Sequence, residues 1–331
     1  MRRQCRFHQL SALALLLILA LANFSAGQDK AKNEKVIPEG TPVMWSEPVD
    51  IASRDLYLGS GGEALKPDLS SVTLIKEEKG GYSTKYRVRD GSGREWVAKI
   101  GKEAQPETAA VRLMWGVGFF SDIDYLVPSV RIEGLNKTLE NVRFGARPKD
   151  IKRVDQWQWA SNPFIGKREF QGLKIMMALL NNWDIKDDNN TILAVRNDND
   201  ENELRYIVHD LGATFGKSGG AFWAITRSRN DPEGYVKTNF IDKVKNGRVD
   251  FHYAGKRSNL FDDITVDDAK WMGHWLSQLS DQQIEDAFRA ANYSPEDVHL
   301  LAGALRERIK ELAALPDSEG RSVNITIKTS P

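Results

Sequence analysis

The chain has 331 residues, of which 41% are hydrophobic and 28% are charged, as in an ordinary globular protein. Its 46 basic side chains balance its 46 acidic ones, so the net charge does not indicate nucleic acid or an anionic membrane as a partner. The only cysteine is Cys5. If the N-terminal segment that contains it is removed, disulfides, thiolate metal sites and a cysteine nucleophile are all excluded.

Residues 1–27 have the layout of a cleaved signal peptide. They contain no acidic side chain, carry arginines near their start and continue with an apolar run at residues 10–21. Ser25 and Gly27 supply the small residues that precede a cleavage site before Gln28. A membrane-spanning helix needs about 20 apolar residues, and this run is shorter. The segment therefore predicts export to a periplasm or the cell exterior, with no transmembrane segment after cleavage.

Composition and patterning divide the rest of the chain. Residues 28–42 are charged, contain two prolines and show no apolar period, so we expect them to form a mobile leader. We predict a leader and N-terminal extension at 28–70, a small β-rich lobe at 71–150, a mainly helical lobe at 151–316 and a polar tail at 317–331.

Short alternating segments in the first lobe predict a small antiparallel sheet. The expected strands are residues 72–78, 80–90, 93–101, 124–134 and 140–148. Gly80 and Gly81 mark the turn between the first two strands. Residues 107–117 have helical spacing, with Pro106 at the expected start, so one helix is inserted after the third strand.

The second lobe is predicted to be mainly helical. An apolar helix over residues 169–183 leads into the polar sequence DIKDDNN at 184–190, which is followed by two short strands at 191–195 and 204–210. A loop-rich stretch continues to about residue 261. Three closing helices begin near Thr265, after Ser280 and after Ser294, and Ser280 with Gln283 makes a capping box.

Two acidic sequences in this lobe have the spacing of a phosphoryl-transfer site. Asp184 precedes Asn189 by five positions, with Lys186 between them, and Asp210 ends the second short strand in the sequence HDLG. Carboxylate and amide oxygens are the ligands that Mg²⁺ prefers. DIKDDN resembles the D-x-K-x-x-N catalytic loop of protein kinases, HDLG resembles their D-F-G sequence, and the strand ending in VAK at Lys99 resembles their lysine strand.

This resemblance to the protein-kinase-like superfamily implies both a fold and a set of roles. It implies an α+β fold of two lobes, a small antiparallel sheet with one helix and a mainly α-helical lobe, with ATP and Mg²⁺ between them. Asp184 would be the catalytic base or orient the acceptor hydroxyl, and Lys186 would reach the γ-phosphate. Asn189 and Asp210 would hold the metal. The cofactor-binding residues would be Lys99 on the α- and β-phosphates, Glu107 as its ion-pair partner, and Gly80 with Gly81 in the glycine loop.

The sequence also departs from the ordinary protein-kinase pattern. Asn182 and Trp183 stand where His-Arg precedes the catalytic aspartate, the glycine loop is reduced to Gly80-Gly81, and no A-P-E segment is present. The histidine directly before the aspartate, His209 before Asp210, resembles the sequence at this position in the phosphoinositide and secretory-pathway kinases. The chain therefore resembles a divergent, atypical member, and adenine contacts cannot be transferred to it.

We predict an exported ATP- and Mg²⁺-dependent phosphotransferase that acts on a hydroxyl of a protein, a lipid headgroup or a glycan. Related folds transfer AMP, so the transferred group is left open. One alternative is a catalytically inactive, kinase-shaped module that regulates a partner. A second alternative is a secreted carbohydrate-binding protein, in which several of the nine tryptophans would form the binding platform.

Overall fold

The computed structural model describes residues 37–80, 83–218 and 222–316. The predicted signal peptide, Gly81 and the predicted tail lie outside the described residues. No helix among the residues described is long and apolar enough to cross a bilayer.

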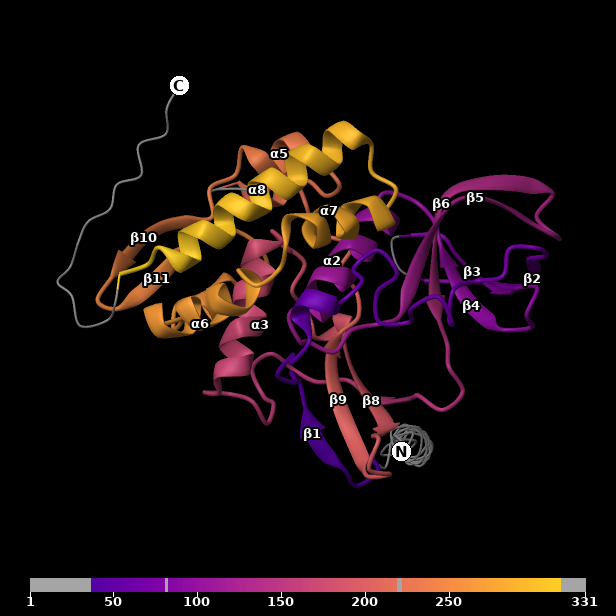
Figure 1. The fold of residues 1–331 in the computed structure, drawn as a ribbon, viewed down its shortest axis with the longest axis horizontal. Helices are drawn as coiled ribbons and strands as arrows, with labels where there is room; N and C mark the ends of the chain where they lie inside the picture. Colours follow the sequence, from indigo (N-terminus) through magenta and orange to yellow (C-terminus); the bar gives the residue numbers. More distant parts are fainter. Residues whose placement is uncertain (1–36, 81–82, 219–221, 317–331) are drawn as a thin grey trace, which may run out of the picture. The chain divides into compact units, whose positions relative to one another are not determined.

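The first sheet has five antiparallel strands in the order β2-β3-β4-β6-β5 (Figure 1). The strands are β2 (Thr73–Glu78), β3 (Lys85–Arg89), β4 (Glu95–Lys99), β5 (Asp124–Ile132) and β6 (Lys137–Ala146). Their apolar side chains alternate and form a cluster around Val88, Trp96 and Phe144, each of which is almost fully buried. These strands confirm the sheet predicted from the alternating sequence.

Helix α2 (Ala104–Gly116) lies between β4 and β5 in the chain and packs against β5, β6 and helix α7. It begins three residues before the predicted Glu107, because Pro106 sits within its first turn, where no backbone N–H is needed. Leu113 and Met114 of α2 join the hydrophobic core of the helical lobe rather than that of the sheet. Because α2 is held from both sides, any residue on it has a fixed position relative to both lobes.

A second sheet has the order β1-β9-β8-β7, with β1 parallel to β9. Its strands are β1 (Thr41–Val43), β7 (Lys152–Asp155), β8 (Asn190–Arg196) and β9 (Asn202–Val208). The prediction that residues 28–42 form a mobile leader is wrong at its C-terminal end. Thr41 and Pro42 pair with β9 at the edge of the sheet, where proline is tolerated, and a three-residue strand is too short to show alternation.

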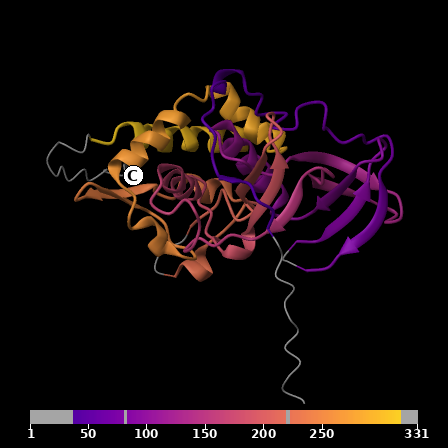
Figure 2. The same cartoon turned by 90° about the horizontal axis from the view of Figure 1, so that it is seen from below.

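The remaining elements build the helical lobe (Figure 2). They are α3 (Arg168–Leu179), α4 (Trp223–Thr226), α5 (Pro232–Val236), α6 (Val266–Leu276), α7 (Asp281–Ala290), α8 (Pro295–Ala313) and the hairpin β10 (Ile241–Lys245) with β11 (Arg248–Phe251). Ser280 and Gln283 form the predicted capping box at α7, and Thr265 with Asp268 forms another at α6. The loop-rich prediction for residues 211–261 missed the β10–β11 hairpin and α5.

The fold class predicted from the sequence is confirmed. The structure is α+β, with a small antiparallel sheet that carries one helix and a mainly helical second lobe. Each lobe has its own buried apolar cluster. The tryptophans at positions 157, 159 and 183 are buried in this packing, so they cannot form the sugar platform of the carbohydrate-binding alternative.

Candidate functional site

A buried lysine at the end of β4 forms the centre of the candidate site. The Nζ atom of Lys99 lies 2.8 Å from a carboxylate oxygen of Glu107, 2.9 Å from Glu103 and 3.3 Å from Asp210. Burial alone would lower the pKa of Lys99, but the three carboxylates, Glu107 foremost, raise it above its ordinary value. The side chain is therefore a fixed cation held between the sheet, helix α2 and the end of β9.

The local sequence explains why two glutamates meet this lysine. Glu103 and Glu107 are four residues apart across the start of α2, so they lie on the same helix face. The resemblance to protein kinases implies only Glu107 as the partner of Lys99, and this ion pair is present. Glu103 also contacts Lys99, and it accepts a hydrogen bond from Ser83 at 2.6 Å and pairs with Arg229. Spacing in the sequence could not separate these two residues because both reach the same atom.

Glu107 is also anchored from behind by a chain of buried charges. Arg143, the register partner of Lys99 on β6, places Nη2 3.0 Å from Glu107 and Nε 2.7 Å from Asp124. Asp124 in turn pairs with Arg112 of α2 at 3.1 Å. Each side chain of this buried network pairs with one of opposite charge. The network therefore fixes α2 against the sheet at the turn that carries Glu107. The sequence held no signal for Arg143, since its partners come from α2 and β5.

Asp210 follows β9 and faces Lys99. Burial would raise the pKa of Asp210, but Lys99 and then His209 lower it to about 2. The backbone N–H of Gly212 lies 3.4 Å from the same carboxylate. Asp210 is thus an ionised oxygen donor at neutral pH, and 29% of its side chain is exposed.

Hydrogen bonds join the predicted catalytic loop to the strand end that carries Asp210. The Asn189 side-chain amide donates to the backbone carbonyl of Asp184 at 2.9 Å, and the backbone N–H of His209 donates to the Asn189 carbonyl at 2.8 Å. This arrangement places Asn189 between Asp184 and the His209–Asp210 segment. His209 lies 3.2 Å from the Asp188 carbonyl through Nε2, and burial lowers the pKa of its imidazole.

Two lysines cover the carboxylate of Asp184. Lys186 lies 3.1 Å from its Oδ2 atom and Lys256 lies 2.5 Å from its Oδ1 atom. The neighbouring Arg257 pairs in the same way with Asp187 at 2.5 Å. Lys256 was not predicted, because it belongs to the loop after β11 and no sequence pattern connects it with Asp184.

Of the two glycines predicted to form the glycine loop between β2 and β3, only Gly80 lies among the described residues. Gly80 follows β2 with φ +107°, a conformation that favours glycine, and a Cβ there would meet no atom within 4 Å. Gly81 lies outside the described residues. The structure places Gly80 at the β2–β3 turn as predicted, and its relation to a nucleotide is still a prediction.

The donor set at this site fits Mg²⁺ in kind. Asp210 offers an ionised carboxylate, and Asn189 uses its Nδ2 atom on Asp184, which leaves Oδ1 as the atom available to a cation. Within the described ranges, no group of three or more His, Cys, Asp or Glu side chains could hold a metal. Mg²⁺ commonly takes only one or two protein ligands and completes its shell with phosphate oxygens and water, so two oxygens suffice.

Neither a family model nor a curated protein sequence matches the chain. Among solved structures, it is similar to the Helicobacter pylori proinflammatory kinase CtkA, with 11% identity, 74% of this chain and 95% of that one covered, and a TM-score of 0.47. It is also similar to the Rio2 kinase of Chaetomium thermophilum, solved as an ADP/Mg²⁺-phosphoaspartate complex. The identity is 14%, the match covers 75% of this chain and 74% of that one, and the TM-score is 0.35. At such low identity, function has to be inferred from the side chains of this chain itself.

Proposed function

We propose that this protein is an exported, ATP- and Mg²⁺-dependent phosphotransferase with a hydroxyl acceptor. The observation that carries the proposal is the meeting of Lys99, Glu107 and Asp210, which come from a strand, a helix and a second strand end. A buried lysine held by a glutamate of the inserted helix and facing a carboxylate is the arrangement that kinase-type phosphoryl transfer requires. Burying these charged groups costs desolvation free energy, and this cost favours a functional role for them over a purely stabilising one.

In this proposal Lys99 binds the α- and β-phosphates, and Glu107 orients it. Arg143 acts behind Glu107 as a positioning residue. Asp210 and Asn189 would hold Mg²⁺, which would neutralise phosphate charge during transfer. Because the pKa of Asp210 is lowered to about 2, its carboxylate carries a negative charge at neutral pH.

Asp184 is proposed to orient the acceptor hydroxyl and accept its proton. Its backbone is fixed by Asn182, which accepts from the Asp184 N–H at 3.1 Å, and by Asn189. Lys186 is proposed to move from Asp184 to the γ-phosphate, since its ammonium already lies at the carboxylate that faces the transferred group. A protein, a lipid headgroup or a glycan would carry the hydroxyl, and transfer of AMP by the same residues is a variant of the proposal.

One observation favours the alternative of an inactive, kinase-shaped binding module. Both oxygens of Asp184 are paired with lysine ammonium groups, one from Lys186 and one from Lys256. An acceptor hydroxyl has to compete with these two ammonium groups for the carboxylate oxygens of Asp184. A pseudokinase would keep these pairs when a nucleotide binds.

The test compares three variants by nucleotide-dependent thermal stabilisation and by transfer. Asp210→Ala should abolish most of the stabilisation by ATP with Mg²⁺, because it removes the charged metal ligand. Asp184→Ala should keep that stabilisation while transfer falls by a factor of about 10² to 10⁴. Asp188→Ala, an exposed carboxylate of the same loop, is the matched control and should change neither.

Unchanged binding and transfer in both Asp210→Ala and Asp184→Ala would contradict the proposal. Nucleotide binding by the wild type without transfer to itself, to water or to any supplied hydroxyl would favour the inactive module instead.

A further inference from the structure

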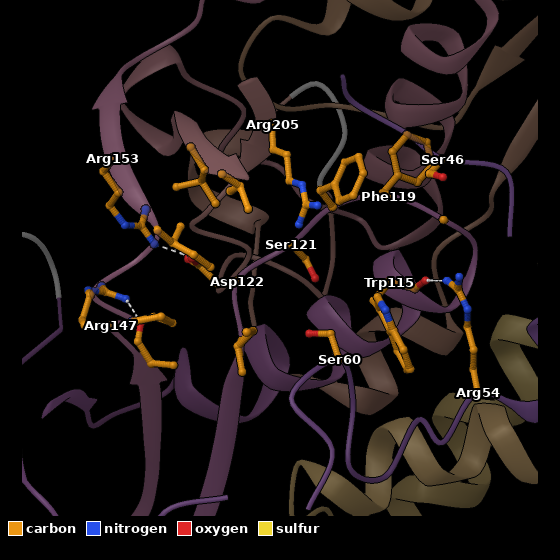
Figure 3. Close-up of a pocket in the computed structure, with 18 residues that line it drawn as sticks. Ser46, Arg54, Ser60, Trp115, Phe119, Ser121, Asp122, Arg147, Arg153 and Arg205 are labelled. Atoms are coloured by element: carbon orange, nitrogen blue, oxygen red, sulfur yellow. Dashed lines mark hydrogen bonds and ion pairs between the residues drawn. The ribbon is translucent and has the colours of Figure 1, made fainter. Parts of the chain in front are cut away.

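A cavity is lined by residues other than those of the proposed transfer site. It has a volume of about 360 Å³ and is lined by the C-terminal end of α2, the segment before β5, the β6–β7 connection, and strands β7, β8 and β9 (Figure 3). Lys99, Asp184, Asn189 and Asp210 do not line it. A volume of a few hundred cubic ångströms is typical of pockets that bind small molecules.

The charge of this cavity is strongly one-sided. Four arginines line it, Arg54, Arg147, Arg153 and Arg205, whereas Asp122 is the only carboxylate of its lining. Asp122 forms an ion pair with Arg153, which a dashed line marks in Figure 3. Arg205 and Arg54 pair with carboxylates outside the lining, Glu203 at 3.0 Å and Asp50 at 2.9 Å.

Among the described residues, Arg147 is the lining arginine that pairs with no carboxylate. Its Nη1 atom donates to the backbone carbonyl of Ala146 at 2.7 Å, and among the described residues its guanidinium forms no ion pair. Burial is the largest cause that lowers the pKa of Arg147 to about 10, and Arg153 and Arg143 add to it while Asp122 opposes. A partly buried cation that is crowded by other cations and lacks its own counter-ion is stabilised most directly by a bound anion.

The number of donors at this end of the cavity indicates which anion. In Figure 3 Arg153 lies above and Arg147 below the level of Asp122, both on the same side of it, and Arg205 extends from β9 nearer to the hydroxyl of Ser121. Guanidinium groups match phosphate and carboxylate oxygens in their geometry. The N–H groups of three guanidinium groups, with a hydroxyl, can donate more hydrogen bonds than the about four that a carboxylate accepts, and a phosphomonoester has three terminal oxygens to accept them.

Most of the remaining lining residues are apolar or aromatic. Trp115, Phe119 and Leu193 contribute to the walls. Phe120, also in the lining, stacks under the Arg205 guanidinium at 4.5 Å and helps to hold that donor in place. Inorganic phosphate would leave these apolar walls uncovered, so the lining fits a ligand with a phosphate at one end and an aromatic or aliphatic group at the other.

We propose that this cavity is a binding site for a small organic phosphate, with the phosphate on Arg147, Arg153 and Arg205 and the organic group against Trp115 and Phe119. The proposal does not depend on phosphoryl transfer at Lys99 and Asp210. The cavity adjoins the end of α2, the helix that carries Glu107, and a ligand here would contact an element that also shapes the proposed transfer site.

Thermal stabilisation by phenyl phosphate, inorganic phosphate and benzoate, at matched ionic strength, tests the proposal. EDTA is present throughout, so that binding through Mg²⁺ at Asp210 does not contribute. Phenyl phosphate should stabilise the wild type saturably, with a lower dissociation constant than inorganic phosphate or benzoate. Arg147→Gln should abolish that stabilisation, and Arg205→Gln should weaken it. Arg131→Gln, an exposed arginine on β5, should leave it unchanged.

An equal response of Arg147→Gln and the wild type would overturn the assignment. If Arg147→Gln does not fold, an unweakened response of Arg205→Gln would have the same consequence. Stabilisation by benzoate but not by phenyl phosphate would overturn the choice of phosphate, and no saturable response to either phosphate would overturn the site. Loss of transfer in Asp210→Ala with retained phenyl phosphate binding would show that the two sites are separate.

Discussion

Lys256 places its ammonium nitrogen 2.5 Å from the Oδ1 atom of Asp184, across 72 positions in the sequence. Lys186 occupies the other carboxylate oxygen at 3.1 Å. In the proposed function Asp184 faces the acceptor hydroxyl and Lys186 moves to the γ-phosphate, so Lys256 is the lysine that then competes with this hydroxyl for the carboxylate.

Replacement of Lys256 by alanine should therefore increase transfer. We expect a severalfold rise in the rate of Mg²⁺-dependent ATP hydrolysis, in which water is the acceptor, because a competitor for Asp184 is removed. The stabilisation by nucleotide and Mg²⁺ should not change, since Lys256 has no contact with Lys99 or Asp210 among the interactions of the described residues.

The matched control is Lys245→Ala, an exposed lysine on the neighbouring strand β10, which should leave hydrolysis unchanged. A fall in hydrolysis in Lys256→Ala would contradict the prediction and would indicate instead that Lys256 assists the transferred phosphate.

Lys99→Met should destabilise the fold much more than Asp210→Ala. Lys99 is shared by Glu103, Glu107 and Asp210, so its removal leaves three carboxylates without their common cation. Loss of one partner of a buried pair costs about 3–5 kcal/mol. Asp210→Ala leaves Lys99 with both glutamates, and it should reduce the free energy of unfolding by no more than about 2 kcal/mol.

Urea unfolding at neutral pH measures both changes. Lys102→Met replaces an exposed lysine three residues further along the chain and controls for the loss of a charge. Equal losses in Lys99→Met and Asp210→Ala would be inconsistent with Lys99 as the centre of the charge network.

Local patterns account for the parts of the fold that the sequence could predict. Ser280 and Gln283 are three residues apart and bond only within one helix turn, so their capping box is visible in the sequence. The strand that ends at Lys99 shows its alternation over a few residues. By contrast, β1 has three residues, and it becomes a strand only because β9 offers it an edge.

The candidate site divides in the same way. Asp184, Asn189 and Asp210 could be found because the spacing within the loop and the strand end is local. Arg143 and Lys256 contact Glu107 and Asp184 only after distant elements have packed, and neither lies in a recognisable pattern. The arginines of the proposed phosphate-binding cavity come from three parts of the chain, at 54, 147–153 and 205, so their meeting at one cavity also depends on the tertiary structure.

Export is a further prediction, carried by the basic start, the apolar run and the small residues of the first 27 positions. Protein recovered from its native host should begin at or near Gln28 and contain no cysteine. Mass spectrometry of the intact protein and N-terminal sequencing measure this. Soluble cytoplasmic protein that retains Met1 would contradict both the signal peptide and the proposed location.

The last prediction concerns the pH dependence of stability at Asp210. The pKa of this carboxyl falls from an ordinary value of 3.8 to about 2 in the folded protein, since Lys99 and His209 outweigh the effect of burial. A carboxyl with a lowered pKa in the folded state stabilises the fold above its unfolded pKa and loses that contribution as the pH falls toward its folded pKa. Asp210 should therefore contribute fully above about pH 4 and progressively less between about pH 4 and 2, by about 2 kcal/mol in total.

Other acidic groups also titrate in this range, so the measurement is the difference in unfolding free energy between the wild type and Asp210→Asn at a series of pH values. At pH 7 the wild type should have a larger free energy of unfolding than Asp210→Asn. This difference should shrink as the pH falls below about 4. Asp188→Asn, at the exposed position of the same segment, controls for the loss of a carboxylate in that segment. A difference for Asp210→Asn that stays constant down to the acid limit of the fold would show that Lys99 does not hold this carboxylate ionised.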